Sequence, residues 1–144
     1  MFFGQHPSSF DADNRLTVPI RFRDSLSRGA FVTQGFDRNL LVLTAEAFQT
    51  LVARFTAMNI ADPLARMLLR MILGSASEVQ VDSSGAILIP QSLRDFAGLE
   101  GEAVLVGQGQ YLEIWTPAQW QQQTQRLQDA QANADRFAGL MLTA

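Results

Sequence analysis

The 144-residue sequence contains no cysteine and no lysine. Without cysteine, the chain can form no disulfide, no thiol nucleophile and no cysteine-ligated zinc site. Without lysine, all 11 basic residues are arginines, and arginine is the side chain best suited to bidentate contacts with phosphate or guanine. An arginine-biased genome gives the same composition. The absence of lysine is therefore compatible with nucleic-acid binding without requiring it.

Long apolar runs and a strong positive charge are also absent. Arginines interrupt the most apolar stretch, LARMLLRMILG at 64–74, before it reaches the length of a membrane span. The first residues, MFFGQHPSS, include no basic segment, so we expect no signal peptide and a cytoplasmic protein. The net charge of −3 argues against a strong general polyanion binder. Residues 1–54 nevertheless hold six arginines and five acidic residues, a net charge of +1, which leaves −4 for the remainder.

Catalytic and metal-binding residues are scarce. The single histidine, His6, lies in a polar N-terminal stretch without a neighbouring aspartate or serine in triad order, so a surface histidine is the simpler interpretation. The stretch DADN at 11–14 begins like a calcium-binding loop, but Leu16 and Phe22 stand where that loop requires glycine and a bidentate glutamate. No glycine-rich phosphate-binding motif follows a predicted strand. We therefore predict that the protein is not an enzyme and holds no metal or cofactor.

The main positive feature of the sequence is an internal repeat. DADNRLTVPIRFRD at 11–24 and DSSGAILIPQSLRD at 82–95 align at an offset of 71, which matches an aspartate with an aspartate at both ends and Pro19 with Pro90. With one inserted residue the offset becomes 72, and VTQGFDRNLLVLT at 32–44 aligns with VLVGQGQYLEIWT at 104–116. A match sustained over this length with a single gap indicates two copies of one supersecondary unit that bury their apolar faces together.

Each copy has the pattern turn, short strand, helical turn, hairpin and helix. Alternating apolar residues after the turn predict the strand, and the proline ends it; these residues are Leu16 and Val18 in the first copy and Ile87 and Ile89 in the second. A hairpin follows, with GFDRN or GQGQ as its loop. Thr44 and Thr116 are predicted to cap the next helix, and Pro117 at the first helical position strengthens the second cap.

A separate helix is predicted between the copies, at DPLARMLLRMILG (62–74). Asp62 caps it, Pro63 starts it and Gly74 ends it. Arg66 and Arg70 share one face, whereas apolar side chains cover most of the rest, so this helix is expected to be buried. The burial can lie within one chain or at an interface between subunits.

The turn of the first copy is a candidate binding site. Asn14 tolerates the left-handed backbone conformation of a tight turn, which places Arg15 near an exposed tip. The Asp11 carboxylate can accept hydrogen bonds from backbone N–H groups across the turn, or it can hold the Arg15 side chain in a fixed pose. An arginine held in this way loses less entropy on meeting phosphate or a guanine edge. A solvated loop with an incidental ion pair is the alternative interpretation.

The two copies resemble SpoVT-AbrB-type swapped-hairpin units, and nearly the whole chain resembles the MraZ family, from MFFGQ through LLRMILGSASEVQVD to EIWTPAQW. The resemblance implies an α+β fold in which two βαβ-hairpin repeats form one pseudo-twofold, double-psi or swapped-hairpin barrel with additional helices. It places the first repeat at 5–47, linking helices at 48–75, the second repeat at 76–119, and a helix in the glutamine-rich tail at 120–144.

The resemblance also implies a function. MraZ-like proteins are bacterial transcriptional regulators of the cluster of division and cell-wall genes; they bind short direct repeats in double-stranded DNA upstream of that cluster and assemble into rings. Their DNA-contacting Asp-x-x-x-Arg motif falls on Asp11 and Arg15, with Asn14 inside it and Arg21 and Arg23 as secondary candidates. The resemblance therefore implies a cytoplasmic, nucleoid-associated homo-oligomer with no membrane partner.

The sequence departs from the family pattern in both turns. Asp13 and Asn14 stand where the family usually has Lys-Gly, and Ala86 stands where the second copy is expected to carry arginine. The loss of positive charge at positions 13 and 86 weakens attraction to phosphate. Either this chain binds DNA through Arg15 with fewer backbone contacts, or it is an oligomeric interaction protein in which DNA binding is reduced.

Overall fold

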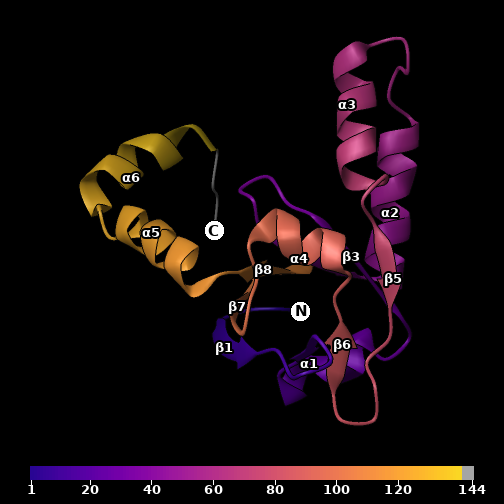
Figure 1. Cartoon of the computed structure of the whole chain (residues 1–144). Coiled ribbons are helices and arrows are strands. Elements are labelled where there is room, and N and C mark those ends of the chain that lie inside the picture. The colour runs from indigo at the N-terminus through magenta and orange to yellow at the C-terminus, as the bar shows by residue number, and fades with distance from the viewer. Residues whose placement is uncertain (141–144) are drawn as a thin grey trace.

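The computed structural model describes residues 1–140 and combines an antiparallel sheet with helices in two copies of one unit (Figure 1). The elements of the first half are β1 (Gln5–Ser9), β2 (Arg15–Thr17), α1 (Ile20–Leu26), β3 (Ala30–Gln34), β4 (Leu40–Thr44) and α2 (Ala45–Thr56). The helix α3 (Pro63–Ile72) leads to the elements of the second half, which are β5 (Ser77–Val79), β6 (Ala86–Leu88), α4 (Gln91–Ala97), β7 (Glu102–Gly107), β8 (Tyr111–Trp115) and α5 (Pro117–Leu127). The predicted α+β class is confirmed.

The larger sheet is built by exchange of strands between the copies. Its order is β1-β7-β8-β4-β3-β5, so the first strand of each copy pairs with the hairpin of the other copy. At the centre, β4 pairs with β8 in a register that joins Leu40 to Ile114 and Val42 to Leu112. The repeat offset of 72 converts each of these pairs into the other. The two hairpins are therefore related by a pseudo-twofold axis.

A second, smaller sheet follows the same symmetry. It consists of β2 and β6 alone, which run antiparallel with Arg15 opposite Leu88 and Thr17 opposite Ala86. The offset of 71 exchanges these two pairs as well. Each strand is only three residues long. Pro19 and Pro90 follow soon after and begin the helices α1 and α4, because proline has no N–H for a strand ladder but fits the start of a helix.

The implied closed swapped-hairpin barrel is not found within residues 1–140. The six-stranded sheet is open, with β1 and β5 at its two edges, and the β2–β6 pair forms a separate sheet. Three-residue strands bounded by turns and prolines offer too few N–H and C=O groups to join both edges of the larger sheet. What the structure bears out is two copies with exchanged strands, packed around one core.

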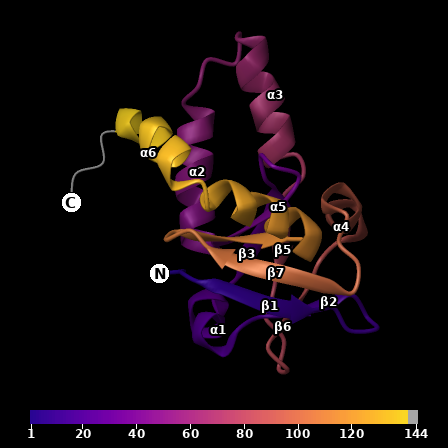
Figure 2. The ribbon, with the colours of Figure 1, turned by 90° about the vertical axis from the view of Figure 1, so that its left-hand side faces the viewer.

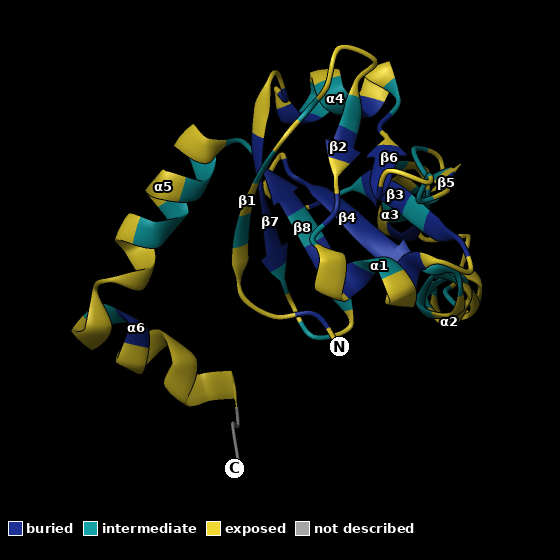
Figure 3. Ribbon diagram, turned by 90° about the horizontal axis from the view of Figure 1, so that it is seen from below, coloured by how far each residue is buried: buried dark blue, intermediate teal, exposed yellow. Residues whose placement is uncertain are grey.

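The core lies between the two sheets and receives equivalent side chains from both copies. Leu16, Val18 and Phe22 are buried, as are their counterparts; the counterparts are Ile87, Ile89 and Leu93. Figure 3 shows the strands of this region as mostly buried, in contrast to the largely exposed C-terminal helices. Burying one such side chain is worth about 1.5–3 kcal/mol relative to leaving it exposed. The apolar residues that the sequence alignment matched between the copies are thus packed in the same core.

The helices that follow each hairpin begin as predicted. The Thr44 hydroxyl accepts a hydrogen bond from the Ala47 N–H, and the Thr116 hydroxyl accepts one from the Gln119 N–H. In the tail, α5 ends at Leu127 and α6 (Ala130–Phe137) begins after Asp129, whose carboxylate accepts from the Ala132 N–H. A 3-10 turn at Ala138–Leu140 completes the described residues. The last part of the predicted tail, 141–144, lies outside them.

The central helix α3 is only partly buried within one chain. Asp62 caps it with a 2.9 Å hydrogen bond from the Leu64 N–H, and Pro63 is its first residue, as predicted. However, α2 and α3 project together away from the sheets (Figures 1 and 2). Leu64 is 71% exposed and Met67 is 66% exposed. With Met58, Leu68 and Met71 they line an apolar groove along this helical hairpin. Within residues 1–140, only Ala65 and Ile72 of this helix are buried, so the expected burial within one chain is found in part.

Candidate nucleic-acid interface

The β2–β6 pair presents one buried face and one outer face. Leu16 and Ile87 point into the core and are fully buried. Residues directly opposite each other, and residues two apart, lie on the same face of a ribbon. The outer face therefore carries Arg15 and Thr17 on β2, and Ala86 and Leu88 on β6. Among these four, Arg15 is the only charged side chain.

The turn before β2 is closed by Asp11. One carboxylate oxygen of Asp11, Oδ1, accepts hydrogen bonds from the backbone N–H groups of Asp13 at 2.8 Å and of Arg15 at 3.1 Å. Asn14 has a φ of 62°, in the left-handed region that asparagine tolerates better than most residues. The backbone of Arg15 therefore follows a tightly fixed turn. Of the two roles considered for Asp11, bonding across the turn is the one that the structure shows.

The turn before β6 repeats this arrangement around Asp82. Its Oδ1 accepts hydrogen bonds from the Ser84 N–H at 2.9 Å, the Ala86 N–H at 3.0 Å and the Ser84 hydroxyl at 2.6 Å. These donors, the Ser84 hydroxyl foremost, lower the pKa of Asp82 to about 2, with a smaller contribution from the positive charge of Arg15. Gly85, with a φ of 83°, takes the place of Asn14. Asp82 is therefore ionised at neutral pH.

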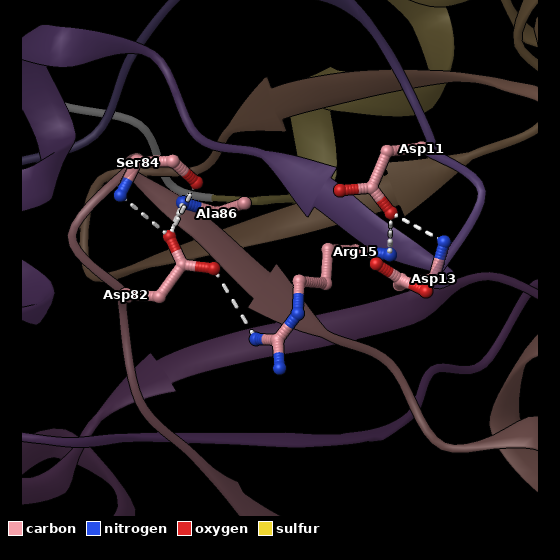
Figure 4. Close-up of polar contacts among 6 residues, drawn as sticks. All are labelled: Asp11, Asp13, Arg15, Asp82, Ser84 and Ala86. Atoms are coloured by element: carbon pink, nitrogen blue, oxygen red, sulfur yellow. Dashed lines mark hydrogen bonds and ion pairs between the residues drawn. The ribbon is translucent and has the colours of Figure 1, made fainter.

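Arg15 connects the two turns. Its Nη1 donates a hydrogen bond to Asp82 Oδ2 at 3.2 Å (Figure 4). This is the single ion pair within residues 1–140, and its side chains are 38% and 28% exposed. Sequence reasoning considered Asp11 as the partner of this guanidinium and missed Asp82. The alignment of Asp11 with Asp82 was a signal that could have identified it, but only the pairing of β2 with β6 brings Asp82 within reach.

The two secondary candidates lie apart from the outer face. The Nε of Arg23 donates to the Val18 carbonyl at 2.8 Å, and Arg94 donates in the same way to the Ile89 carbonyl at 3.0 Å. Arg23 also lines a shallow surface pocket together with Asp82 and Gly85. The guanidinium of Arg21 lies 5.5 Å from the centre of the Phe3 ring. The structure thus brings Arg23 close to the second turn and directs Arg21 to the N-terminal segment.

Gly85 is favoured chiefly by its backbone conformation, and the nearest side chain is the movable end of Arg23. A β-carbon at this position would collide with the guanidinium of Arg23. Its φ of 83° is also strained for any residue with a side chain. We therefore expect Gly85→Ala to destabilise the protein by about 1–3 kcal/mol, as judged from losses at other incompatible backbone positions. Chemical denaturation of the parent and the variant measures this difference. Gly101→Ala, at a similar φ with no neighbouring atom in the way, is the control that separates backbone strain from collision.

The described part of the chain lacks the features of several other kinds of site. No helix within residues 1–140 has the length and apolar character to cross a membrane. The same residues contain no cluster of three or more His, Asp or Glu side chains placed to hold a metal ion. His6 lies edge-on to Phe22, with ring centres 5.0 Å apart, and its Nε2 forms a 3.0 Å hydrogen bond with the Phe3 carbonyl. These contacts give the histidine a packing role.

The chain is similar to known proteins along almost its entire length. The family model described as "MraZ protein, putative antitoxin-like" matches residues 1–71 and again residues 72–139. A Roseiflexus castenholzii protein named transcriptional regulator MraZ is 39% identical over 138 residues, which are 96% of this chain and 94% of that protein. Proteins of the same name from Thermomicrobium roseum and Corynebacterium kroppenstedtii are 37% and 36% identical, over 98% and 96% of this chain and 100% and 96% of their own lengths.

Proposed function

This chain belongs to the MraZ family, and from that premise we propose that it is a transcriptional regulator that binds DNA through the outer face of the β2–β6 ribbon. The names of its relatives support the regulatory role. The observation that carries the DNA-binding part is the position of Arg15, on an exposed ribbon face at the end of a rigid turn. The proposed DNA-binding site consists of Arg15, which contacts DNA, and of Asp11 and Asn14, which shape its turn, with Arg23 nearby.

The shape of this face suits the major groove. That groove is about 12 Å wide and admits a two-stranded β-ribbon, and several regulators use strands in this way. An arginine that approaches there can donate two hydrogen bonds to the O6 and N7 atoms of one guanine. Asp11 and Asn14 act indirectly, since they shape the turn that presents Arg15. A ribbon with a single guanidinium can recognise only a short sequence, which is consistent with short repeated operators.

Several such faces must act together for useful affinity. The net charge of −3 and the two aspartates of the first turn give little general attraction to DNA. We therefore propose a ring-shaped homo-oligomer in the cytoplasm, associated with the nucleoid, whose subunits bind direct repeats upstream of its own gene and of the division and cell-wall cluster. Linking modest sites raises the overall affinity by about 100- to 10,000-fold when their spacing fits.

A gel-shift series tests the proposal. DNA from upstream of the gene, carrying the direct repeats, is titrated with the protein at several salt concentrations beside a duplex of equal length with scrambled repeats. We expect preferential binding to the repeats and a loss of affinity with salt. Equal and weak binding to both duplexes would count against DNA recognition. It would favour a second function, an oligomeric interaction protein, for which the three aspartates around Arg15 and the exposed groove on α3 are the supporting observations.

The apolar groove along α3, which Met58 and Asn59 of the preceding segment also line, is the surface that we propose for assembly. Met67→Asp places a charge on this apolar surface, where burying it at an interface is unfavourable. Because Met67 is exposed in the single chain, we expect the variant to keep its fold and to lose the oligomer. Light scattering measures the mass, and circular dichroism measures the fold. Ser25→Asp, which adds the same charge to an exposed position of α1, is the control. An unchanged mass for Met67→Asp would exclude the groove from the interface.

A further inference from the structure

The two carboxylate oxygens of Asp82 accept hydrogen bonds from different partners. Oδ1 accepts the three hydrogen bonds that close the second turn, all from Ser84 and Ala86. Oδ2 accepts only the guanidinium of Arg15, which belongs to the first copy. Asp11, the counterpart of Asp82, closes its own turn through Oδ1 in the same manner. Within residues 1–140, therefore, one of two equivalent aspartates has a partner in the opposite copy.

The small side chain at position 86 explains this asymmetry. The register places Arg15 opposite Leu88, at the far end of β6, whereas its guanidinium bonds to Asp82, which precedes β6. The Arg15 side chain must therefore run back along β6 past Ala86, which lies on the same face and is only 4% exposed (Figure 4). Arg15 and Ala86 are equivalent under the repeat offset of 71. Because Ala86 carries only a methyl group, the guanidinium of Arg15 can pass over it and reach Asp82 without competing with a second long side chain on this face.

We propose that Asp82 is a positioning residue for DNA recognition, which holds Arg15 in the pose that reads a base and discourages it from binding phosphate. This inference rests on the proposed function. Asp82 engages Nη1 alone, so the edge formed by Nη2 and Nε keeps two parallel N–H donors. Those two donors match the bidentate geometry that a guanine edge accepts. The second copy thus contributes to recognition through an acidic residue.

Two opposing effects of Asp82 make the inference testable. Its negative charge lowers the attraction of Arg15 to phosphates, which every duplex carries, and so weakens non-specific binding. Its hydrogen bond restricts a flexible side chain before DNA arrives, which favours the one geometry that matches a base. Removing the charge should therefore weaken specific binding while sparing or strengthening non-specific binding. A purely structural role predicts that both decrease together.

Asp82→Asn is the appropriate variant, because asparagine keeps the oxygen that closes the turn and loses the charge that holds Arg15. We expect its affinity for the repeat duplex to fall about three- to tenfold for each engaged subunit. Its affinity for the scrambled duplex should stay equal to that of the parent or rise. Ser84→Ala is the matched control in the same turn: it removes one hydrogen bond to Oδ1 and leaves the contact between Asp82 and Arg15 intact. It should keep the ratio of the two affinities.

The outcomes separate this inference from the proposed function. If the parent does not prefer the repeats, the proposed function fails, and this inference fails with it. If the parent prefers them and Asp82→Asn keeps the same preference, only the role of Asp82 is refuted. A parallel loss of both affinities, or a loss of preference in Ser84→Ala as large as in Asp82→Asn, also refutes it. Should Asp82→Asn not fold, Asp82→Ser carries the same expectation, since serine also closes such turns.

Discussion

Arg15→Ala is expected to remove the proposed preference of the protein for DNA that carries the direct repeats. A bidentate arginine contact contributes about 1–3 kcal/mol of discrimination against the wrong base. Because each engaged subunit of the proposed ring loses this contact, the losses multiply, and binding to the repeat duplex should fall to that of a scrambled duplex. The fold and the proposed oligomer should persist, since Arg15 lies on the outer face, is partly exposed and, within residues 1–140, forms one side-chain ion pair, with Asp82.

Two variants show whether this loss belongs to the guanidinium or to its charge. Arg15→Lys keeps the charge and loses the planar fork, so it should retain non-specific affinity and lose most of the preference for the repeats. Arg54→Ala removes the same charge from an exposed position in the last turn of α2, away from the ribbon. It should lower both affinities slightly and equally. If Arg15→Ala binds the repeats as well as the parent does, Arg15 is not the reading residue.

Much of the fold was predictable because the chain contains two copies of one pattern. Each copy must bury an alternating apolar face, and the other copy is the nearest surface that can cover it. The alignment of Leu16 with Ile87 therefore predicted residues that the structure places directly opposite each other and fully buries. The caps at Thr44, Asp62 and Thr116 were predictable for a local reason, since each depends on only a few neighbouring residues.

The exchange of strands and the open sheet were not accessible to the same reasoning. Strand pairing between residues that are far apart in the sequence, such as Gln5 with Val106 and Ala30 with Val79, depends on which edges remain free after the hairpins form. Periodicity does not contain that information. The burial of α3 was ambiguous for a related reason. Its apolar composition demands a partner surface, but composition cannot say whether that surface belongs to the same chain. Leu64 and Met67 are exposed because no part of residues 1–140 covers them.

The candidate site was predictable in its parts and not in its assembly. Local turn chemistry indicated the role of Asn14 and the bonds from Asp11 to backbone N–H groups, and the structure contains both. The guanidinium of Arg15 was considered with the nearest aspartate in the sequence. Its actual partner, Asp82, is 67 residues away and becomes adjacent only when β2 pairs with β6.

Asp13→Lys is expected to strengthen DNA binding. Asp13 is exposed in the turn beside Arg15 and contributes its backbone N–H to Asp11, so lysine can replace its side chain without breaking the turn. The substitution changes the charge by two units at the face that is proposed to meet the phosphates. Each new phosphate contact should steepen the dependence of log affinity on log salt by about 0.9. Because phosphate contacts carry no sequence information, the affinities for repeat and scrambled duplexes should rise together.

Ala86→Arg is the comparison variant for Asp13→Lys, because it adds a positive charge at the other end of the β2–β6 ribbon. By the pseudo-twofold symmetry, an arginine at 86 is directed toward Asp11, as Arg15 is directed toward Asp82. A guanidinium engaged in that way adds little to phosphate binding, so the salt slope should stay close to that of the parent. Because it also occupies the path by which Arg15 reaches Asp82, the preference for the repeats should fall. Melting temperatures of both variants test whether the fold is kept. Should Ala86→Arg raise the affinity and steepen the slope while Asp13→Lys changes neither, the second turn, and not the first, is the one that meets DNA.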